Sequence, residues 1–199
     1  TGGHNVAYGY QALCSNTTAN YNAAFGTKAL ISNTTGAQNT ASGYAALAVN
    51  STGTRNVASG TKSLYSNTTA SYNTASGFYS LFNNTTGTHN TASGYRALLS
   101  NTTASYNTAV GSCTLYANTT GASNTAVGYH ALKTNTCGHR NTAVGMLALG
   151  STTCGDCNTA SGYNAIGANT TGSQNTGFGI NVMAYNTTGS NNVAFGMAA

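Results

Sequence analysis

A period of seventeen residues runs along this chain with no residue inserted or lost, and it limits the fold more than any other feature of the sequence. The stretches Asn90–Tyr106 and Asn107–Ser123 read NTASGYRALLSNTTASY and NTAVGSCTLYANTTGAS. Eleven full units extend from Asn5 to Asn191, with a partial unit at each end. Residues 1–199 are therefore predicted to be a single repeat array, and we expect it to be a segment of a longer fibre because both ends cut through a unit.

Three positions of the unit, numbered from its opening asparagine, hardly vary: position 1 is asparagine, position 5 is glycine and position 9 is a large apolar residue. Identical amides that stack on one another hydrogen-bond into ladders along the stack. The predicted structural ladder comprises Asn5, Asn22, Asn39, Asn56, Asn73, Asn90, Asn107, Asn124, Asn141, Asn158, Asn175 and Asn192. The predicted core column comprises Leu13, Leu30, Leu47, Leu64, Leu81, Leu98, Leu115, Leu132, Leu149, Ile166 and Met183.

The residue types of the unit favour β-structure over helix. Glycine, asparagine, threonine and serine dominate each unit, and these residues prefer turns or extended backbone. One unit is therefore predicted to be one rung of an all-β parallel solenoid, a β-roll or β-helix with 17-residue rungs. Within each rung we expect two or three short strands, near NTASG and YRALL, with corners at the glycine and at NTTG or NTTA. Rungs about 4.8 Å apart would give a rod roughly 55 Å long.

The apolar content of one unit is small. Besides the large residue at position 9, only alanine at position 3 and a small residue at position 8 recur in nearly every unit. Burying so little apolar area contributes little against the conformational entropy that is lost when a whole rung is ordered. We therefore expect several chains to wind side by side and share a core.

The repeated segments resemble those of known fibre proteins. NTAVGYHAL at Asn124–Leu132, NTASGYAAL at Asn39–Leu47 and the intervening NTTG segments are similar to repeats of bacteriophage tail-fibre proteins, which often precede a self-cleaving intramolecular chaperone. More distantly, TAVG at Thr125–Gly128 resembles the VAIG-type strand in the left-handed β-roll of trimeric autotransporter adhesin heads, whose units are shorter. The resemblance covers the whole chain. It implies a homotrimeric fibre, extracellular or on a virion surface, with receptor-binding and chaperone domains outside this segment.

These observations predict a structural protein, a fibre shaft of the tail-fibre or adhesin-stalk kind that spaces and presents a distal binding domain. The expected partners are further copies of the chain, as a trimer or filament, and a cell-surface receptor or glycan bound by domains outside this segment. An alternative of another class is an ice-binding β-solenoid that uses threonine and asparagine columns, since such proteins display regular threonine arrays on a flat face. Positions 2 and 4 mix several residue types, which favours the shaft.

Catalysis is not expected of this segment. Asp156 is the only acidic residue, so the chain has no pair of carboxylates for glycoside hydrolysis and no carboxylate cluster for calcium. The histidines lie at scattered repeat positions: His4, His89, His130 and His139. We predict no catalytic residue and no cofactor.

The net charge of +5 is spread thinly along the chain. Lys28, Lys62 and Arg96 share position 7 at intervals of 34 residues, which places like charges on every second rung. This spacing is typical of a solvated face and lacks the clustered basic groove of nucleic-acid-binding proteins. No apolar run approaches the length of a membrane span. We expect neither nucleic-acid binding nor membrane insertion.

Two cysteines fall in the same column. Cys137 and Cys154 occupy position 14 of consecutive units, and stacking would place their Cα atoms about 5 Å apart, within the range of a disulfide. His139 and Cys157 lie nearby in the sequence, so a zinc cluster of Cys137, His139, Cys154 and Cys157 is a competing interpretation, and free thiols are a third. A disulfide would agree with an extracellular setting.

The asparagine at position 12 opens an N-x-S/T/C acceptor sequence for glycosylation in ten units. The simpler interpretation, which we favour, is that asparagine fits a corner of the rung. The acceptor asparagines are Asn16, Asn33, Asn50, Asn67, Asn84, Asn101, Asn118, Asn135, Asn169 and Asn186.

Overall fold

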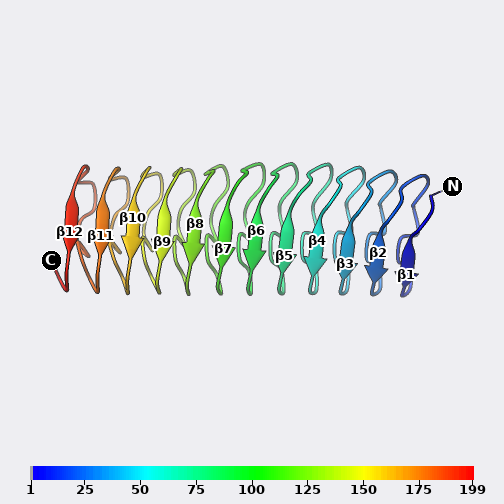
Figure 1. Cartoon of the computed structure of the whole chain (residues 1–199), viewed down its shortest axis with the longest axis horizontal. Helices are drawn as coiled ribbons and strands as arrows, with labels where there is room; N and C mark the ends of the chain where they lie inside the picture. Colours follow the sequence, from blue (N-terminus) through cyan, green and yellow to red (C-terminus); the bar gives the residue numbers. More distant parts are fainter. Residues whose placement is uncertain (1) are drawn as a thin grey trace.

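The computed structural model describes residues 2–199 as a row of twelve short strands along one rod (Figure 1). Each strand has three residues and occupies positions 2 to 4 of its unit. The strands are β1 (Val6–Tyr8), β2 (Ala23–Phe25), β3 (Thr40–Ser42), β4 (Val57–Ser59), β5 (Thr74–Ser76), β6 (Thr91–Ser93), β7 (Thr108–Val110), β8 (Thr125–Val127), β9 (Thr142–Val144), β10 (Thr159–Ser161), β11 (Thr176–Phe178) and β12 (Val193–Phe195). Within residues 2–199, no helix is long and apolar enough to cross a membrane.

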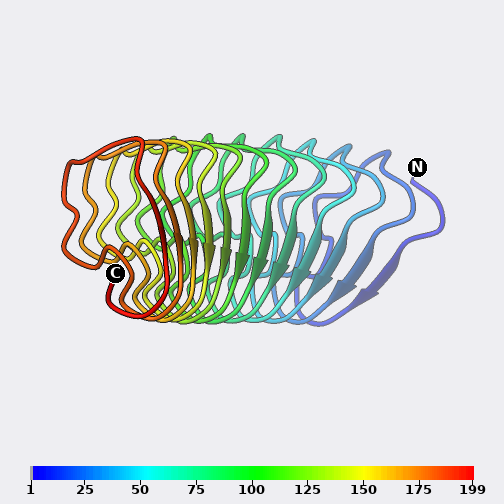
Figure 2. The same ribbon diagram turned by 60° about the vertical axis from the view of Figure 1, so that its left-hand side comes forward.

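The strands form one parallel sheet in chain order, and every pairing joins residues seventeen positions apart. In the pair β6 and β7, for example, Thr91 lies opposite Thr108 and Ala92 opposite Ala109. Each unit makes one turn around an enclosed interior, as the oblique view along the rod shows (Figure 2). The predicted parallel β-solenoid of about eleven turns, with one seventeen-residue rung per unit, is confirmed.

The prediction of a second strand near YRALL is wrong. In the unit that opens at Asn90, the segment after Gly94 is a turn, and it contains two left-handed residues, Arg96 (φ 54°) and Leu98 (φ 52°). The same left-handed conformation recurs at positions 7, 9 and 17 of the units. Residues with a side chain lose about 1–2 kcal/mol in this conformation, so helix or strand propensity gives no hint of it.

Hydrogen bonds between rungs continue through this turn and stabilise it. The backbone N–H of Arg96 donates to the carbonyl oxygen of Phe78 in the preceding rung (3.0 Å), while the N–H of Leu98 donates to Thr114 in the following rung (3.0 Å). The alternating backbone therefore ties each rung to both neighbours. It also turns the leucine side chain inward, where it is fully buried.

The invariant glycine at position 5 marks the corner at which the strand ends. Gly94 has φ 135°, which a residue with a side chain rarely adopts, and a Cβ atom there would lie 2.5 Å from the carbonyl oxygen of Gly111 in the next rung. Only glycine lets successive rungs approach this closely at the corner.

The core is a stack of columns enclosed by one chain. Position 9 is fully buried from Leu30 to Ile166, and the buried alanines of positions 3 and 8 pack against it. Leu13 and Met183, in the first and last full units, are partly buried. The predicted leucine core is confirmed.

The expectation that several chains share this core rested on the small apolar area of each rung, and the structure removes that reason. The leucine column of a single chain is already closed to solvent. The interior also has a polar half, in which two columns of buried asparagines are hydrogen-bonded, except at Oδ1 of Asn135. Hydrogen-bonded amides can fill an interior at little cost, whereas unpaired ones cannot.

Candidate functional site

One face of the sheet is open and regular. In each strand the middle residue points into the rod and the outer two point away from it, as in β8, where Ala126 is fully buried and Thr125 and Val127 are exposed. Because the register repeats from strand to strand, positions 2 and 4 form two parallel columns along the rod. We call these two columns from β3 to β10 the hydroxyl face.

The hydroxyl face contains only small side chains, without charge. Position 2 supplies threonine in seven of the eight strands and Val57 in the other; position 4 supplies serine or valine. Its residues are Thr40, Ser42, Val57, Ser59, Thr74, Ser76, Thr91, Ser93, Thr108, Val110, Thr125, Val127, Thr142, Val144, Thr159 and Ser161. The residue types that are mixed at position 4 in the sequence are separated along the rod. The aromatic ones lie only in β1, β2, β11 and β12, as Tyr8, Phe25, Phe178 and Phe195.

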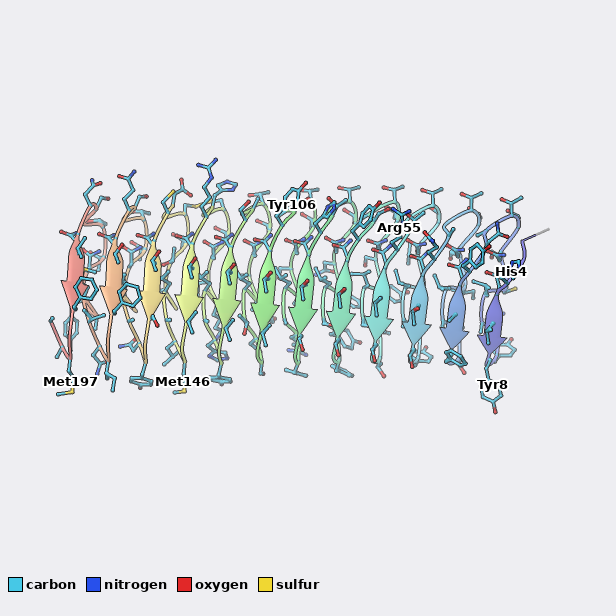
Figure 3. The ribbon with its side chains drawn as sticks, viewed as in Figure 1. His4, Tyr8, Arg55, Tyr106, Met146 and Met197 are labelled. Atoms are coloured by element: carbon cyan, nitrogen blue, oxygen red, sulfur yellow. A yellow bond between two sulfur atoms is a disulfide. The ribbon has the colours of Figure 1, made fainter. Side chains whose placement is uncertain are left out.

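Larger side chains stand along both edges of this face. His4, Arg55 and Tyr106, all at position 17, lie along one edge, and Met146 and Met197, both at position 6, lie along the other (Figure 3). The position-17 edge contains a continuous stack: the rings of Tyr72 and His89 are 4.8 Å apart. The stack continues on both sides, through Arg55 over the Tyr72 ring and through Tyr106 beside His89.

Two of the three cations of position 7, Lys62 and Arg96, pack against aromatic rings. The ammonium nitrogen of Lys62 lies 5.7 Å from the centre of the Tyr65 ring and 5.5 Å from that of Tyr79. A hydrogen bond with Tyr79 raises the pKa of Lys62. Arg96 packs in the same way over Tyr95, at 5.0 Å. These cations are therefore held individually on a mixed aromatic surface.

The position-1 asparagines form the predicted column, although their bonding differs from a simple amide ladder. The backbone N–H of Asn107 donates to Oδ1 of Asn90 (3.0 Å), and Nδ2 of Asn90 donates to the carbonyl oxygen of Ala104 (2.8 Å). This side chain to backbone pattern recurs along the column, and a bond between two side-chain amides is added at four steps. Each asparagine is thus fastened to the backbone of the next rung.

The amide ladder is found at position 12, the column whose asparagines were expected to fit a corner of the rung and, as an alternative, to accept glycans. Nδ2 of Asn101 donates to Oδ1 of Asn84 (2.8 Å) and to the carbonyl oxygen of Ala104 (3.0 Å), and Nδ2 of Asn118 donates to Oδ1 of Asn101 (2.9 Å). Eight of the ten acceptor asparagines are fully buried; Asn16 and Asn186, near the two ends, are half-buried. Glycosylation at the eight buried asparagines is therefore wrong for the folded chain, because their amide nitrogens are enclosed and already donate hydrogen bonds.

The cysteine column contains the disulfide. Cys137 and Cys154 are bonded, with Cα atoms 4.8 Å apart, as the repeat register predicts. The competing zinc cluster does not form, because no three His, Cys, Asp or Glu side chains come together among residues 2–199. Cys157 is an exposed thiol in another column, and Nδ1 of His139 accepts the backbone N–H of Ala122 (3.0 Å). Cys14 and Cys113 are also free thiols.

The single carboxylate has a structural partner. Oδ1 of Asp156 accepts the backbone N–H of His139 in the preceding rung (2.7 Å). Asp156, His139, Arg140 and Cys157 line a shallow hollow on the surface together with Ala122 and Ser123. The carboxylate is thus used to join two rungs, in the same way that serine hydroxyls are used elsewhere in this column.

No protein-family model, curated protein or solved structure matches this chain.

Proposed function

We propose that this chain is the shaft of a fibre, extracellular or on a virion surface, and that it holds a distal binding domain at a fixed distance. The observation that carries the proposal is continuity. The same parallel register joins each unit to the next from β1 to β12, without a bulge, an insertion or a change of direction. A chain built in this way has one long dimension, which increases by one strand spacing for every unit added.

Stiffness supports the same function. Each rung is joined to its neighbours by hydrogen bonds in the sheet, in the turn after the glycine corner and in both asparagine columns. Bending the rod would lengthen these bonds on one side in every rung, and breaking a buried one leaves a polar group without a partner. A rod of this kind resists bending, and in residues 2–199 the turns between strands are held from rung to rung by hydrogen bonds, which limits the access of proteases.

The disulfide and the outer columns agree with the proposed setting. A bonded pair such as Cys137 and Cys154 persists in an oxidising compartment, which supports a location outside the cytoplasm. Association into a trimer, which the resemblance to tail fibres implies, would have to use outer columns, because the leucine column is enclosed within one chain. Recognition of a receptor or glycan would belong to domains outside this segment.

Electron microscopy of the native assembly tests the proposal. A thiol label on Cys157, in a chain in which Cys14 and Cys113 are replaced by serine, should appear on a thin stalk between a base and a tip. Between β1 and β12 the stalk should advance by about 53 Å, which is eleven strand spacings of about 4.8 Å. A label that sits on a globular head, or on the surface that contacts the target, would contradict the shaft function.

A further inference from the structure

We propose that the hydroxyl face binds ice. This inference goes beyond the shaft and does not depend on it, since a rod can adsorb to ice whether or not it supports a distal domain. Three properties of the face lead to it: free hydroxyl and methyl groups, a rigid two-dimensional spacing and the absence of charge.

The structure distinguishes threonines whose hydroxyl groups make no hydrogen bond within the protein from threonines whose hydroxyl groups do. At position 13 the hydroxyl is an internal donor, as in Thr85, whose Oγ1 donates to the carbonyl oxygen of Thr102 (3.0 Å). At position 2 the hydroxyls of Thr74, Thr91 and Thr125 belong to exposed outward-facing side chains with no such bond to the next rung. The asparagine columns are buried. Position 14 also has exposed threonines, such as Thr86 and Thr120, but they lie at a bend of the rung; position 2 is the free threonine column that lies in the flat sheet.

The spacing of these groups is regular in two directions. Along the rod the rungs are 4.8 Å apart, measured between the Cα atoms of Cys137 and Cys154. Across the face, positions 2 and 4 of a strand lie about 6.6 Å apart, two residues at about 3.3 Å each. A flat grid of groups with fixed repeats in two directions can contact a crystalline solid at many points at once. Val110, Val127 and Val144 at position 4 add branched methyl groups beside the threonines of β7, β8 and β9.

The absence of charge on the hydroxyl face argues against nucleic acids and anionic membranes as its partners. The hydroxyl face has no ionisable group. The cations beside it are Arg55 and Arg140 at position 17, along one edge, while Lys62 and Arg96 at position 7 pack on aromatic rings. An uncharged face complements an uncharged solid, whereas a phosphate backbone or an anionic membrane requires clustered cations. Phe25 in β2 and Phe178 in β11 end the run of small position-4 side chains, so the proposed site extends from β3 to β10.

The test compares two matched double variants for their effect on ice recrystallisation. In Thr91→Lys/Thr125→Lys, two exposed threonines of the hydroxyl face, two rungs apart, are replaced. In the control, Thr86→Lys/Thr120→Lys, two exposed threonines of position 14 with the same separation are replaced. The parent chain and the control should both inhibit recrystallisation, and the face variant should need at least tenfold more protein for the same effect. Circular dichroism melting establishes that each variant is folded.

A third variant separates loss of fit from loss of folding. Thr125→Val keeps the branched shape, so it should keep most of the inhibition in a folded chain. The proposal is overturned if the parent chain leaves ice crystals unaffected, or if the face and control variants lose activity equally. It is also overturned if sedimentation shows a dimer that the face variant alone dissociates, since the face would then be covered by a second copy of this chain.

Discussion

The two buried asparagine columns lie in the same interior and donate to the same carbonyl oxygens, yet they are joined from rung to rung in different ways. The position-1 column has an asparagine in every unit and fastens each side chain to the backbone N–H of the next rung. The position-12 column fastens side chain to side chain, and it is interrupted by Thr152. At the interruption, Oδ1 of Asn135 and Oγ1 of Thr152 are buried without a hydrogen-bond partner. A ladder between side chains is therefore locally fragile, because each member needs its neighbour to be an amide.

The disulfide spans the same step at which the ladder is broken. Asn135 and Cys137 lie in one rung, and Thr152 and Cys154 lie in the next. A covalent bond thus joins the two rungs that lack an amide to amide bond. Substitutions in the two columns test how the continuous position-1 column and the interrupted position-12 column differ in stability.

The largest effect is expected from Asn90→Ala in the continuous column. The change leaves the backbone N–H of Asn107 buried without an acceptor and removes one donor to Ala104. We expect the free energy of unfolding to fall by roughly 3–4 kcal/mol, in the range for an orphaned backbone group plus a lost hydrogen bond. Asn101→Ala, which leaves only side-chain amides without partners, should cost about 2 kcal/mol. Urea unfolding measures both, and an equal loss in the two variants would remove the distinction between the columns.

Reduction of the disulfide should have the next largest effect. Opening a loop of seventeen residues removes about 3 kcal/mol of stabilisation in the chain-entropy description. The loss should be measurable as a lower thermal midpoint of Cys137→Ser/Cys154→Ser. Serine at the free thiols Cys14, Cys113 and Cys157 serves as the control and should leave the midpoint unchanged. If the thermal midpoint of the control falls as far as that of the disulfide variant, the disulfide does not specifically stabilise these two rungs.

A smaller gain is expected when the ladder itself is repaired. Thr152→Asn gives Oδ1 of Asn135 a donor and restores the amide at a position where the other full units have one. The unfolding free energy should rise by about 1 kcal/mol. The destabilisation caused by reducing the disulfide should shrink in the same variant, since the two rungs then hold a second connection. Ser151→Asn, at an exposed position one residue before Thr152 in the same rung, is the matched control. A gain that appears in both variants would point to a general effect of asparagine instead of the ladder.

The smallest effect concerns pH. Burial, with a contribution from the Lys133 cation, lowers the pKa of His130. The unfolded chain therefore binds the proton more readily, so this contribution to stability is complete above the ordinary histidine pKa of about 6.5 and is lost as the pH falls below it. The asparagine columns do not titrate. The thermal midpoint should drop slightly between pH 7.5 and pH 5, and His130→Gln should remove part of that drop. The difference in unfolding free energy between Asn90→Ala and Asn101→Ala should stay constant over the same pH range. A change in this difference would show that a titrating group contributes to one column.

The repeat period was enough to predict what depends on register alone. It predicted the parallel stack, the buried column from Leu30 to Ile166 and the pairing of Cys137 with Cys154, because each follows from placing residue i over residue i+17. It could not predict the course of the chain within a rung. Leu98 and its equivalents adopt a left-handed backbone that leucine disfavours in isolation, and only hydrogen bonds between rungs make it favourable.

The roles of the two asparagine columns were likewise hidden in the sequence. Both columns recur with the same period, and periodicity does not say which side of the rung is inside. The sequence therefore predicted that position 12 lies at a corner but not that its side chains are enclosed. One signal was present: an asparagine followed three residues later by glycine or alanine, which places a carbonyl within reach of the amide, as in Asn101 and Ala104. The hydroxyl face was missed for a related reason, since its uniform middle and aromatic ends separate only when the columns are laid along the rod.

The most direct test of this account is the thermal unfolding midpoint of two deletion variants. Removal of residues 107–123 takes out one complete rung and leaves every column in register, so the midpoint should stay within a few degrees of that of the parent chain. Removal of residues 107–122 leaves one extra residue and shifts the corner glycine, the core leucine and both asparagine columns of the neighbouring rungs out of line. This second chain should lose most of its cooperative transition. If the two deletions melt alike, equivalent side chains are not stacked one layer per seventeen residues.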